Sequence, residues 1–302
     1  MATRWRPDPT GNRRWKQGAV HGTTGLTKYG DQGTEDMSSF GKGSHLHLID
    51  GSAFIFRAYH ALPPLTRKSD GLPVGAVSGF VNLLQKYIEG NSGKDAATHI
   101  AVIFDYSGKS FRNDLYPLYK AQRPPAPEDL IPQFPLTRRA TEAFNIACKE
   151  IEGFEADDII ATLVHEHGTI MNTGAEKILI LSGDKDFIQL QTYGNVDQYN
   201  PVMKKWVRHD NPDKYLEEHV LRGDVGDGIP NVLSPDNCLA VGTRQKPMTK
   251  KRITQFLSEP DTMDEETKLR FNRNKQMIDL SQIPSEYGDQ ILEQYNNAKE
   301  VG

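Results

Sequence analysis

The chain contains few cysteines and no long apolar run. Only two of its 302 residues are cysteine, Cys148 and Cys238, and neither belongs to a CxxC pair or a His/Cys ligand spacing. A disulfide framework and a zinc site are therefore not indicated, and a reducing, cytoplasmic setting is the default. No apolar stretch approaches the ~18 to 20 residues that cross a bilayer, and the N-terminus lacks a basic-then-apolar secretory pattern. We expect no membrane partner.

Three motifs of common enzymes and a basic excess are also missing. The sequence shows no Ser-His-Asp grouping, no Walker loop and no GxGxxG. The net charge is -4, whereas a protein that contacts phosphates usually shows a basic excess. That objection weakens if nine carboxylates described below hold divalent metals, because removing their nine negative charges leaves +5 on the remainder. The sign of the whole chain would then hide a basic surface around an acidic pocket.

The chain divides into three regions. Residues 1–44 are rich in Gly, Thr and Arg and have no sustained period of 2 or 3.6, so we expect a disordered extension of which residues 1–36 are dispensable. Residues 45–200 alternate strand-like and helical patterns, which predicts an α/β domain with a mostly parallel central sheet flanked by helices. Residues 201–302 begin with a small hairpin whose turn holds Asn200 and Pro201, and the rest is mostly helical.

Three apolar strand-like runs of the α/β region each end in acidic residues. They are residues 45–50, ending in Asp50, residues 98–105, ending in Asp105, and residues 177–186, ending in Asp184 and Asp186. Parallel strands present the side chains at their carboxyl ends on one edge of the sheet, where catalytic and metal-binding carboxylates are usually found. For a single aspartate, a helix N-cap or a turn is the commoner role. Several such sites in one α/β unit favour a binding site.

A fourth acidic group lies in the stretch GFEADDII, residues 153–160, at the start of a helical pattern. Glu155, Asp157 and Asp158 crowd into four residues. The alternatives are acidic residues favoured by the helix dipole, or a solvated acidic face. A divalent cation among them would keep such carboxylates ionised.

The acidic residues together suit a metal centre. They are Asp50, Asp105, Glu155, Asp157, Asp158, Asp184, Asp186, Asp224 and Asp227. Hard oxygen ligands in this number favour Mg²⁺, for which Mn²⁺ can substitute. Two ions ~3.5 to 4 Å apart would support phosphodiester hydrolysis by activating a water and stabilising the leaving oxygen.

A basic and aromatic segment, residues 107–130, points to a substrate that carries phosphate. It interleaves Lys109, Arg112, Lys120 and Arg123 with Phe111, Tyr116 and Tyr119. Basic groups neutralise phosphates, and aromatic faces stack on unpaired bases. The alternative is an ordinary exposed helix whose tyrosines pack inward.

Four stretches carry a resemblance to a known family. LIDGSAFIFRAYHAL, VIFDYSGKSFRNDLYPLYKAQRPPAPEDL, EIEGFEADDIIATL and ILSGDKDFIQL resemble the 5′ nuclease domain of bacterial DNA polymerase I. From Tyr199 onward the chain is more similar to the T-even phage ribonuclease H branch of the same 5′-to-3′ exonuclease and flap endonuclease family. The resemblance implies a PIN/resolvase-like fold with a helical arch around residues 106–140 and a C-terminal region that binds duplex DNA.

The resemblance also implies roles for individual residues. One metal would be held by Asp50, Asp105, Glu155 and Asp157, and the other by Asp158, Asp184, Asp186, Asp224 and Asp227, some of them through water. Lys120 and Arg123 match gateway residues that contact the scissile phosphate. Arg57 and Tyr119 match auxiliary substrate contacts.

One departure concerns duplex binding. Polymerase-type members follow the last aspartate pair with a glycine-rich hairpin that grips DNA through backbone amides and a monovalent ion, and here Pro230 leads into a segment without those glycines. This argues against a potassium site. Basic side chains would bind the duplex instead. They are Arg244, Lys246, Lys250, Lys251 and Arg252.

The expected function is a metal-dependent 5′-to-3′ exonuclease and flap endonuclease or ribonuclease H that removes RNA primers and 5′ flaps during DNA replication. Its partners would be DNA and RNA–DNA hybrid, and we expect a monomer in the cytoplasm of a phage-infected bacterial cell. Recruitment by a replication clamp or a single-strand-binding protein is left open. The alternatives are a catalytically idle binder of branched nucleic acid, or a phosphatase for small molecules, which would need neither the basic gateway nor the basic C-terminal region.

Overall fold

The computed structural model describes residues 27–28, 45–90, 96–167 and 177–297. The extension expected to be disordered lies outside these ranges, except for Thr27–Lys28. These two residues form strand β1 and pair antiparallel with β3, so the expectation is wrong at this point. The pairing supplies backbone hydrogen bonds at one end of β3.

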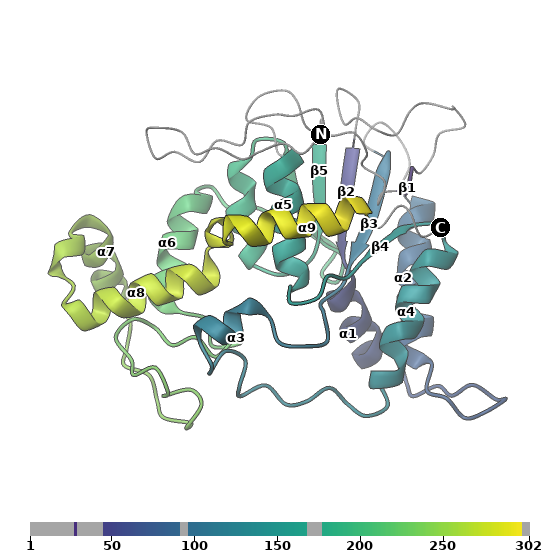
Figure 1. Cartoon of the computed structure of the whole chain (residues 1–302), viewed down its shortest axis with the longest axis horizontal. Coiled ribbons are helices and arrows are strands. Elements are labelled where there is room, and N and C mark those ends of the chain that lie inside the picture. The colour runs from purple at the N-terminus through teal and green to yellow at the C-terminus, as the bar shows by residue number, and fades with distance from the viewer. Residues whose placement is uncertain (1–26, 29–44, 91–95, 168–176, 298–302) are drawn as a thin grey trace.

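The centre of the molecule is one mixed, mostly parallel sheet (Figure 1). Its further strands are β2 (His45–Asp50), β3 (His99–Ile103), β4 (Ala147–Lys149), β5 (Lys177–Leu181), β6 (Val196–Asn200) and β7 (Lys205–Val207). The order is β1-β3-β2-β5-β6-β7, with β4 also paired to β3. The pairs β2–β3, β2–β5, β3–β4 and β5–β6 are parallel. This confirms the predicted α/β class.

Helices cover both faces of the sheet because its strands are apolar on both sides. Along β2, Leu46 and Leu48 pack into one core while Ile49 packs into the other, as the two-residue period of a strand requires. Helices α1 (Gly51–Ala61), α2 (Gly75–Gly90) and α4 (Phe134–Ala143) cover the face of Ile49, and α5 (Ala156–His167) and α9 (Ser285–Asn297) cover the other (Figure 1).

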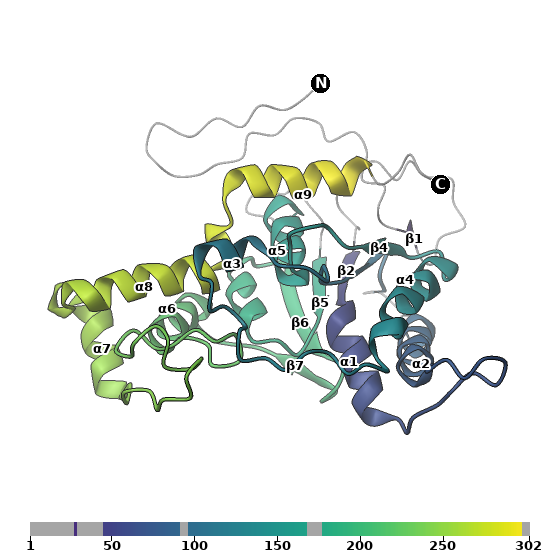
Figure 2. The ribbon, with the colours of Figure 1, turned by 60° about the horizontal axis from the view of Figure 1, so that its bottom comes forward.

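The predicted arch region contains little regular helix. Within it the structure forms α3 (Phe111–Leu115), the short 3₁₀ helix η1 (Ile131–Gln133) and the start of α4. Residues 116–130 between them make turns and extended backbone. Figures 1 and 2 show this segment crossing from α3, on the side of α6 and α8, to α4, on the side of α1 and α2.

The C-terminal region confirms the predicted hairpin and helices. Strands β6 and β7 pair antiparallel around the turn after Asn200. The helices are α6 (Pro212–Arg222), α7 (Lys250–Ser258) and α8 (Glu265–Ile278), and the short 3₁₀ helices are η3 (Pro260–Thr262) and η4 (Leu280–Gln282). A further 3₁₀ helix, η2 (Asp186–Thr192), lies before this region, between β5 and β6. Helix α6 begins after the N-cap Asn211, whose side chain accepts from the Lys214 N–H, and ends at the C-cap Gly223. Within the described ranges, no helix combines the length and apolar character needed to cross a membrane.

Candidate metal centre

Asp50 and Asp105 lie at the carboxyl ends of the neighbouring parallel strands β2 and β3, and backbone amides fix them there. Asp50 caps α1 by accepting a hydrogen bond from the Ala53 N–H at 2.9 Å, and its other oxygen accepts one from Ser182 Oγ at 2.8 Å. Asp105 accepts from the Ala156 N–H, at the first residue of α5, at 2.7 Å. The caps that start two helices therefore also aim two carboxylates at one edge of the sheet.

Asp157 joins these carboxylates from the first turn of α5. Burial, followed by the charges of Asp184, Asp50 and Asp105, raises the pKa of Asp157 well above its usual range. Burial and the charge of Asp105 raise the pKa of Asp50 to about 7. Without a cation, the mutual repulsion of these carboxylates favours their protonated forms. A divalent ion bound among them would favour the ionised forms instead.

Asp186 and Asp224 form a second group together with His219, which the sequence analysis missed. The ligand atoms of these three residues lie within 4.8 Å of one another. His219 Nδ1 lies 3.3 Å from Asp186 Oδ1, and His219 Nε2 lies 3.3 Å from Asp224 Oδ2. Burial and the charge of Asp184 raise the pKa of Asp186 to about 7. A sequence signal existed, since His219 lies in the last turn of the helix that ends just before Asp224.

Glu155 and Asp227 lie beside the gateway residues. The Tyr119 hydroxyl lies 2.8 Å from Glu155 Oε2 and 2.9 Å from Asp227 Oδ2. Lys120 Nζ donates to Glu155 Oε1 at 2.8 Å, and Arg123 forms an ion pair with Asp227. Burial alone would raise the pKa of Glu155, but the positive charges of Lys120 and Arg112 outweigh it and hold the pKa below its usual value.

Asp158 does not reach the second group, and its assignment to the second metal is wrong. Its side chain is 0% exposed and accepts a hydrogen bond from Arg112 Nη1 at 2.8 Å. Successive residues of a helix point about 100° apart, so Asp157 and Asp158 cannot both face the sheet edge. Asp157, in place of Asp158, links the two groups of carboxylates.

Arg112 is likewise unavailable to nucleic acid, so that prediction is also wrong. Its side chain is 4% exposed, and Nε donates to the Met277 carbonyl at 3.0 Å. Tyr116 and Tyr119 are 5% and 4% exposed, which confirms the alternative that the tyrosines of this segment pack inward. Tyr119 still touches the site through its hydroxyl, but its ring is not open for stacking on a base.

The remaining predicted contacts are more accessible. The side chains of Lys120 and Arg123 are 26% and 50% exposed, Lys109 is exposed and Arg57 is half-buried. The predicted duplex contacts are all exposed and lie in the loop before α7 and in its first turn. They are Arg244, Lys246, Lys250, Lys251 and Arg252.

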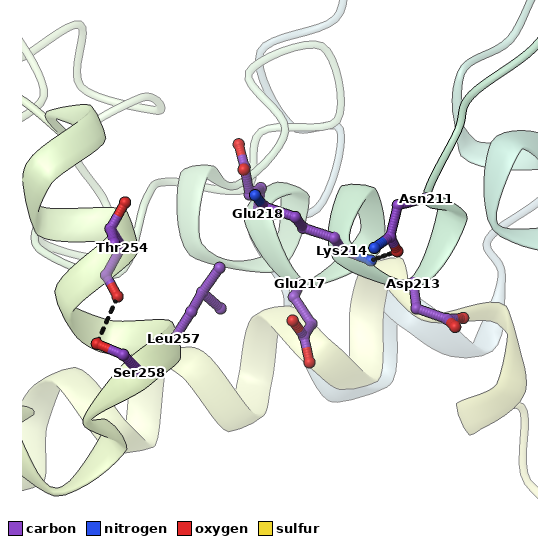
Figure 3. Close-up of a pocket in the computed structure, with 8 residues that line it drawn as sticks. All are labelled: Asn211, Asp213, Lys214, Glu217, Glu218, Thr254, Leu257 and Ser258. Atoms are coloured by element: carbon purple, nitrogen blue, oxygen red, sulfur yellow. Dashed lines mark hydrogen bonds between the residues drawn. The ribbon is translucent and has the colours of Figure 1, made fainter.

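A shallow hollow between α6 and α7 is a separate feature (Figure 3). Its lining includes Asp213, Glu217 and Glu218, and Lys214 is its one basic residue. None of the nine predicted metal ligands lines it. Its acidic rim is unsuited to phosphate, so the hollow is not the nucleic-acid site.

The donor set at the sheet edge fits divalent cations. Two groups of carboxylates from separate elements converge there, and burial penalises their negative charge. Lys120 and Arg123 lie next to them, paired with Glu155 and Asp227. Acidic metal ligands flanked by basic side chains are the arrangement that metal-assisted cleavage of a phosphodiester requires.

Comparisons with known proteins agree with this geometry. Residues 45–220 match the family model described as "5'-3' exonuclease, N-terminal resolvase-like domain". DNA polymerase I of Rhizobium leguminosarum is 50% identical over 202 residues, which cover 63% of this chain and 19% of that protein. The 5'-3' exonuclease of Aquifex aeolicus is 34% identical over 197 residues, which cover 62% of this chain and 64% of that protein. The chain thus spans less than two thirds of the length of these relatives.

Solved structures show the same fold. The T5 D15 protein co-crystallised with metal ions aligns over 85% of this chain and 100% of its own, with a TM-score of 0.56 and 20% identity. The T5 D15 flap endonuclease in a pseudo-enzyme-product complex with DNA and metal ions aligns over 84% of this chain and 97% of its own, with a TM-score of 0.57 and 20% identity. The predicted resolvase-like architecture is therefore confirmed.

Proposed function

Because this chain belongs to the 5′-3′ exonuclease family, we propose that it is a metal-dependent 5′ nuclease acting on DNA and on RNA paired to DNA. Its substrates are 5′ ends and 5′ flaps, and its task is the removal of RNA primers and flaps during replication. The observation that carries the proposal is the meeting of Asp50, Asp157 and Asp186 at one sheet edge beside Lys120.

The carboxylates divide between two cations. Asp50, Asp105, Asp157 and Asp184 would hold one. This differs from the assignment that the resemblance implies, because Asp184 acts on Asp50 and Asp157 and moves to this group, and Glu155 pairs with Lys120 and leaves it. Asp186, Asp224 and Asp227 would hold the other, with Asp157 between the two groups. Mg²⁺ suits the oxygen ligands, and Mn²⁺ can substitute. When bound, the cations activate a water and neutralise the charge that develops on the leaving oxygen.

The gateway residues position the scissile phosphate. Lys120 Nζ and the Arg123 guanidinium lie against Glu155 and Asp227, next to the metal ligands. A phosphate at this point would meet the positive charges of Lys120 and Arg123. Both side chains could then exchange their ion pairs with carboxylates for ion pairs with phosphate oxygens. Glu155 and Asp227 therefore hold the gateway cations in place until the substrate arrives.

The region after residue 200 supplies the remaining contacts. We assign residues 45–200 to the nuclease domain and residues 201–302 to duplex binding, through the exposed basic residues near α7. The protein would act as a monomer in the cytoplasm of a phage-infected bacterial cell. Recruitment by a replication clamp or a single-strand-binding protein is proposed from the family resemblance alone.

One digestion experiment tests the proposal. Matched end-labelled 5′-flap, nicked and RNA-primed duplexes are incubated with Mg²⁺, and the product lengths are read. We expect 5′-terminal products from the wild type and none from Asp184→Asn, which still binds flap DNA in Ca²⁺. The control is Asp197→Asn, an exposed aspartate on β6 of the same sheet. Binding without cleavage by the wild type would favour the idle binder, and cleavage by Asp184→Asn would refute the assigned centre.

A further inference from the structure

His219 places an imidazole between carboxylates from two different elements. Asp186 begins η2 after strand β5, Asp224 follows the end of α6, and His219 lies on α6 itself. The ring directs one nitrogen to each carboxylate, at 3.3 Å on both sides. The ring of Tyr215, one turn earlier on α6, lies next to the imidazole, with 5.8 Å between the centroids and 59° between the ring planes.

The spacing of the three side chains is that of a metal site with one nitrogen donor. Their ligand atoms lie within 4.8 Å of one another, so shifts of a few tenths of an ångström would let one ion touch all three at bond lengths of about 2.0 to 2.2 Å. A histidine that binds a metal usually donates its other ring N–H to a carboxylate. His219 has such a carboxylate on each side. One ring nitrogen can therefore face the ion while the other donates its N–H to one oxygen of a carboxylate, whose second oxygen can complete the site.

We propose that Asp186, His219 and Asp224 form a mixed nitrogen–oxygen metal site that selects Mn²⁺ over Mg²⁺. Imidazole binds transition metals more readily than Mg²⁺, which keeps oxygen ligands and waters. The inference deepens the proposed function, because this site coincides with the second of the two cations. It rests on the proposed metal centre, and its test uses no nucleic acid.

The test compares Mn²⁺ binding by the metal-stripped full chain and two variants. His219→Gln keeps a polar side chain of similar length but removes the imidazole. The matched control is His209→Gln, an exposed histidine whose ring also lies next to Tyr215, with 5.1 Å between the centroids. Electron paramagnetic resonance counts bound Mn²⁺, electron spin echo modulation detects a ¹⁴N ligand, and calorimetry measures Mg²⁺ affinity.

We expect a ¹⁴N coupling on Mn²⁺ in the wild type and in His209→Gln, and its loss in His219→Gln. The Mn²⁺ affinity of one site should fall about tenfold or more in His219→Gln, whereas the affinity for Mg²⁺ changes much less. If the imidazole only bridges the carboxylates as a cation, its removal would leave Mn²⁺ affinity unchanged or raise it, which would overturn the proposal. So would absence of ¹⁴N coupling in the wild type, a readout that needs no variant to fold. A wild type that binds Mn²⁺ through nitrogen but cleaves no DNA would refute the proposed function alone.

Discussion

Arg112 and Asp158 form an ion pair that is closed off from solvent, with Arg112 Nη1 2.8 Å from Asp158 Oδ2 and side-chain exposures of 4% and 0%. Asp158 also accepts a hydrogen bond from the Glu155 N–H at 3.0 Å, and Arg112 Nε donates to the Met277 carbonyl. The pair therefore joins α3, the start of α5 and the end of α8. It thereby connects the end of α8, in the C-terminal region, to the start of α5, where Glu155 and Asp157 lie.

Breaking this pair should destabilise the protein strongly. Arg112→Met leaves the Asp158 carboxylate buried without its partner, and we expect the free energy of unfolding to fall by about 3–5 kcal/mol. Urea unfolding followed by circular dichroism measures it. The matched control is Arg208→Met, which breaks an exposed ion pair with Asp197 and should cost at most about 1 kcal/mol. Equal losses in the two variants would contradict a structural role for Arg112.

The strand ends and the hairpin could be predicted from the sequence because each depends on local pattern. The apolar run that ends in Asp50 and the hairpin that turns after Asn200 lie as expected. The position of Asp50 and Asp105 at the ends of two strands also predicted that they share one edge of the sheet, because parallel strands align their carboxyl ends.

What the sequence could not supply is the direction of side chains whose partners lie far away in the chain. The resemblance assigned Asp158 to the second metal, but its side chain pairs with Arg112, which is 46 residues away in the chain, and is buried there. His219 could not be predicted as a site residue, because a histidine on an amphipathic helix has many roles. Only the fold places Asp186 next to it. Lys120 was expected on a helix and instead has a φ of 56° in a turn.

The metal-free protein should lose stability as pH rises. The pKa values of Asp50 and Asp186 are raised to about 7 in the folded state, chiefly by burial, from the ordinary 3.8. Between pH 4 and pH 7 the folded state therefore binds more protons than the unfolded state. The protonated forms of Asp50 and Asp186 thus contribute fully to stability below about pH 4, and this contribution is lost as pH rises through about 7. We expect a fall of several kcal/mol in urea unfolding with EDTA, since each unit of pKa shift is worth about 1.4 kcal/mol.

Two comparisons isolate these groups from the rest of the chain. Saturating Mg²⁺ should remove most of the fall, because a cation stabilises the ionised carboxylates. Asp50→Asn should make the fall shallower, since the amide does not titrate. A metal-free stability that rises between pH 5 and pH 7 would contradict the raised pKa values.

Lys120→Ala should slow hydrolysis without unfolding the protein. The ammonium pairs with Glu155 at 2.8 Å, and Glu155 retains the Tyr119 hydroxyl when the lysine is removed. Loss of one positive charge at the phosphate should lower single-turnover cleavage about 100-fold. Lys86→Ala, which changes an exposed lysine on α2, is the control. An unfolded circular dichroism spectrum, or an unchanged rate, would count against the gateway role.

Gly223→Ala should disturb the loop that carries Asp224 and Asp227. Gly223 ends α6 with a φ of +66° and a ψ of −178°, a region that is essentially restricted to glycine and costs a residue with a side chain about 1–3 kcal/mol. A Cβ there would also lie 2.3 Å from the Ile229 carbonyl oxygen, so the backbone has to move. We expect lower unfolding free energy together with weaker divalent-metal binding, because Asp224 is the next residue.

Gly194→Ala is the matched control, since its φ is not positive and a Cβ there would meet nothing within 4 Å. Thermal unfolding and metal titration of both variants measure the effect, and a Gly223→Ala protein with wild-type metal affinity would show that Asp224 is not held in place by this turn.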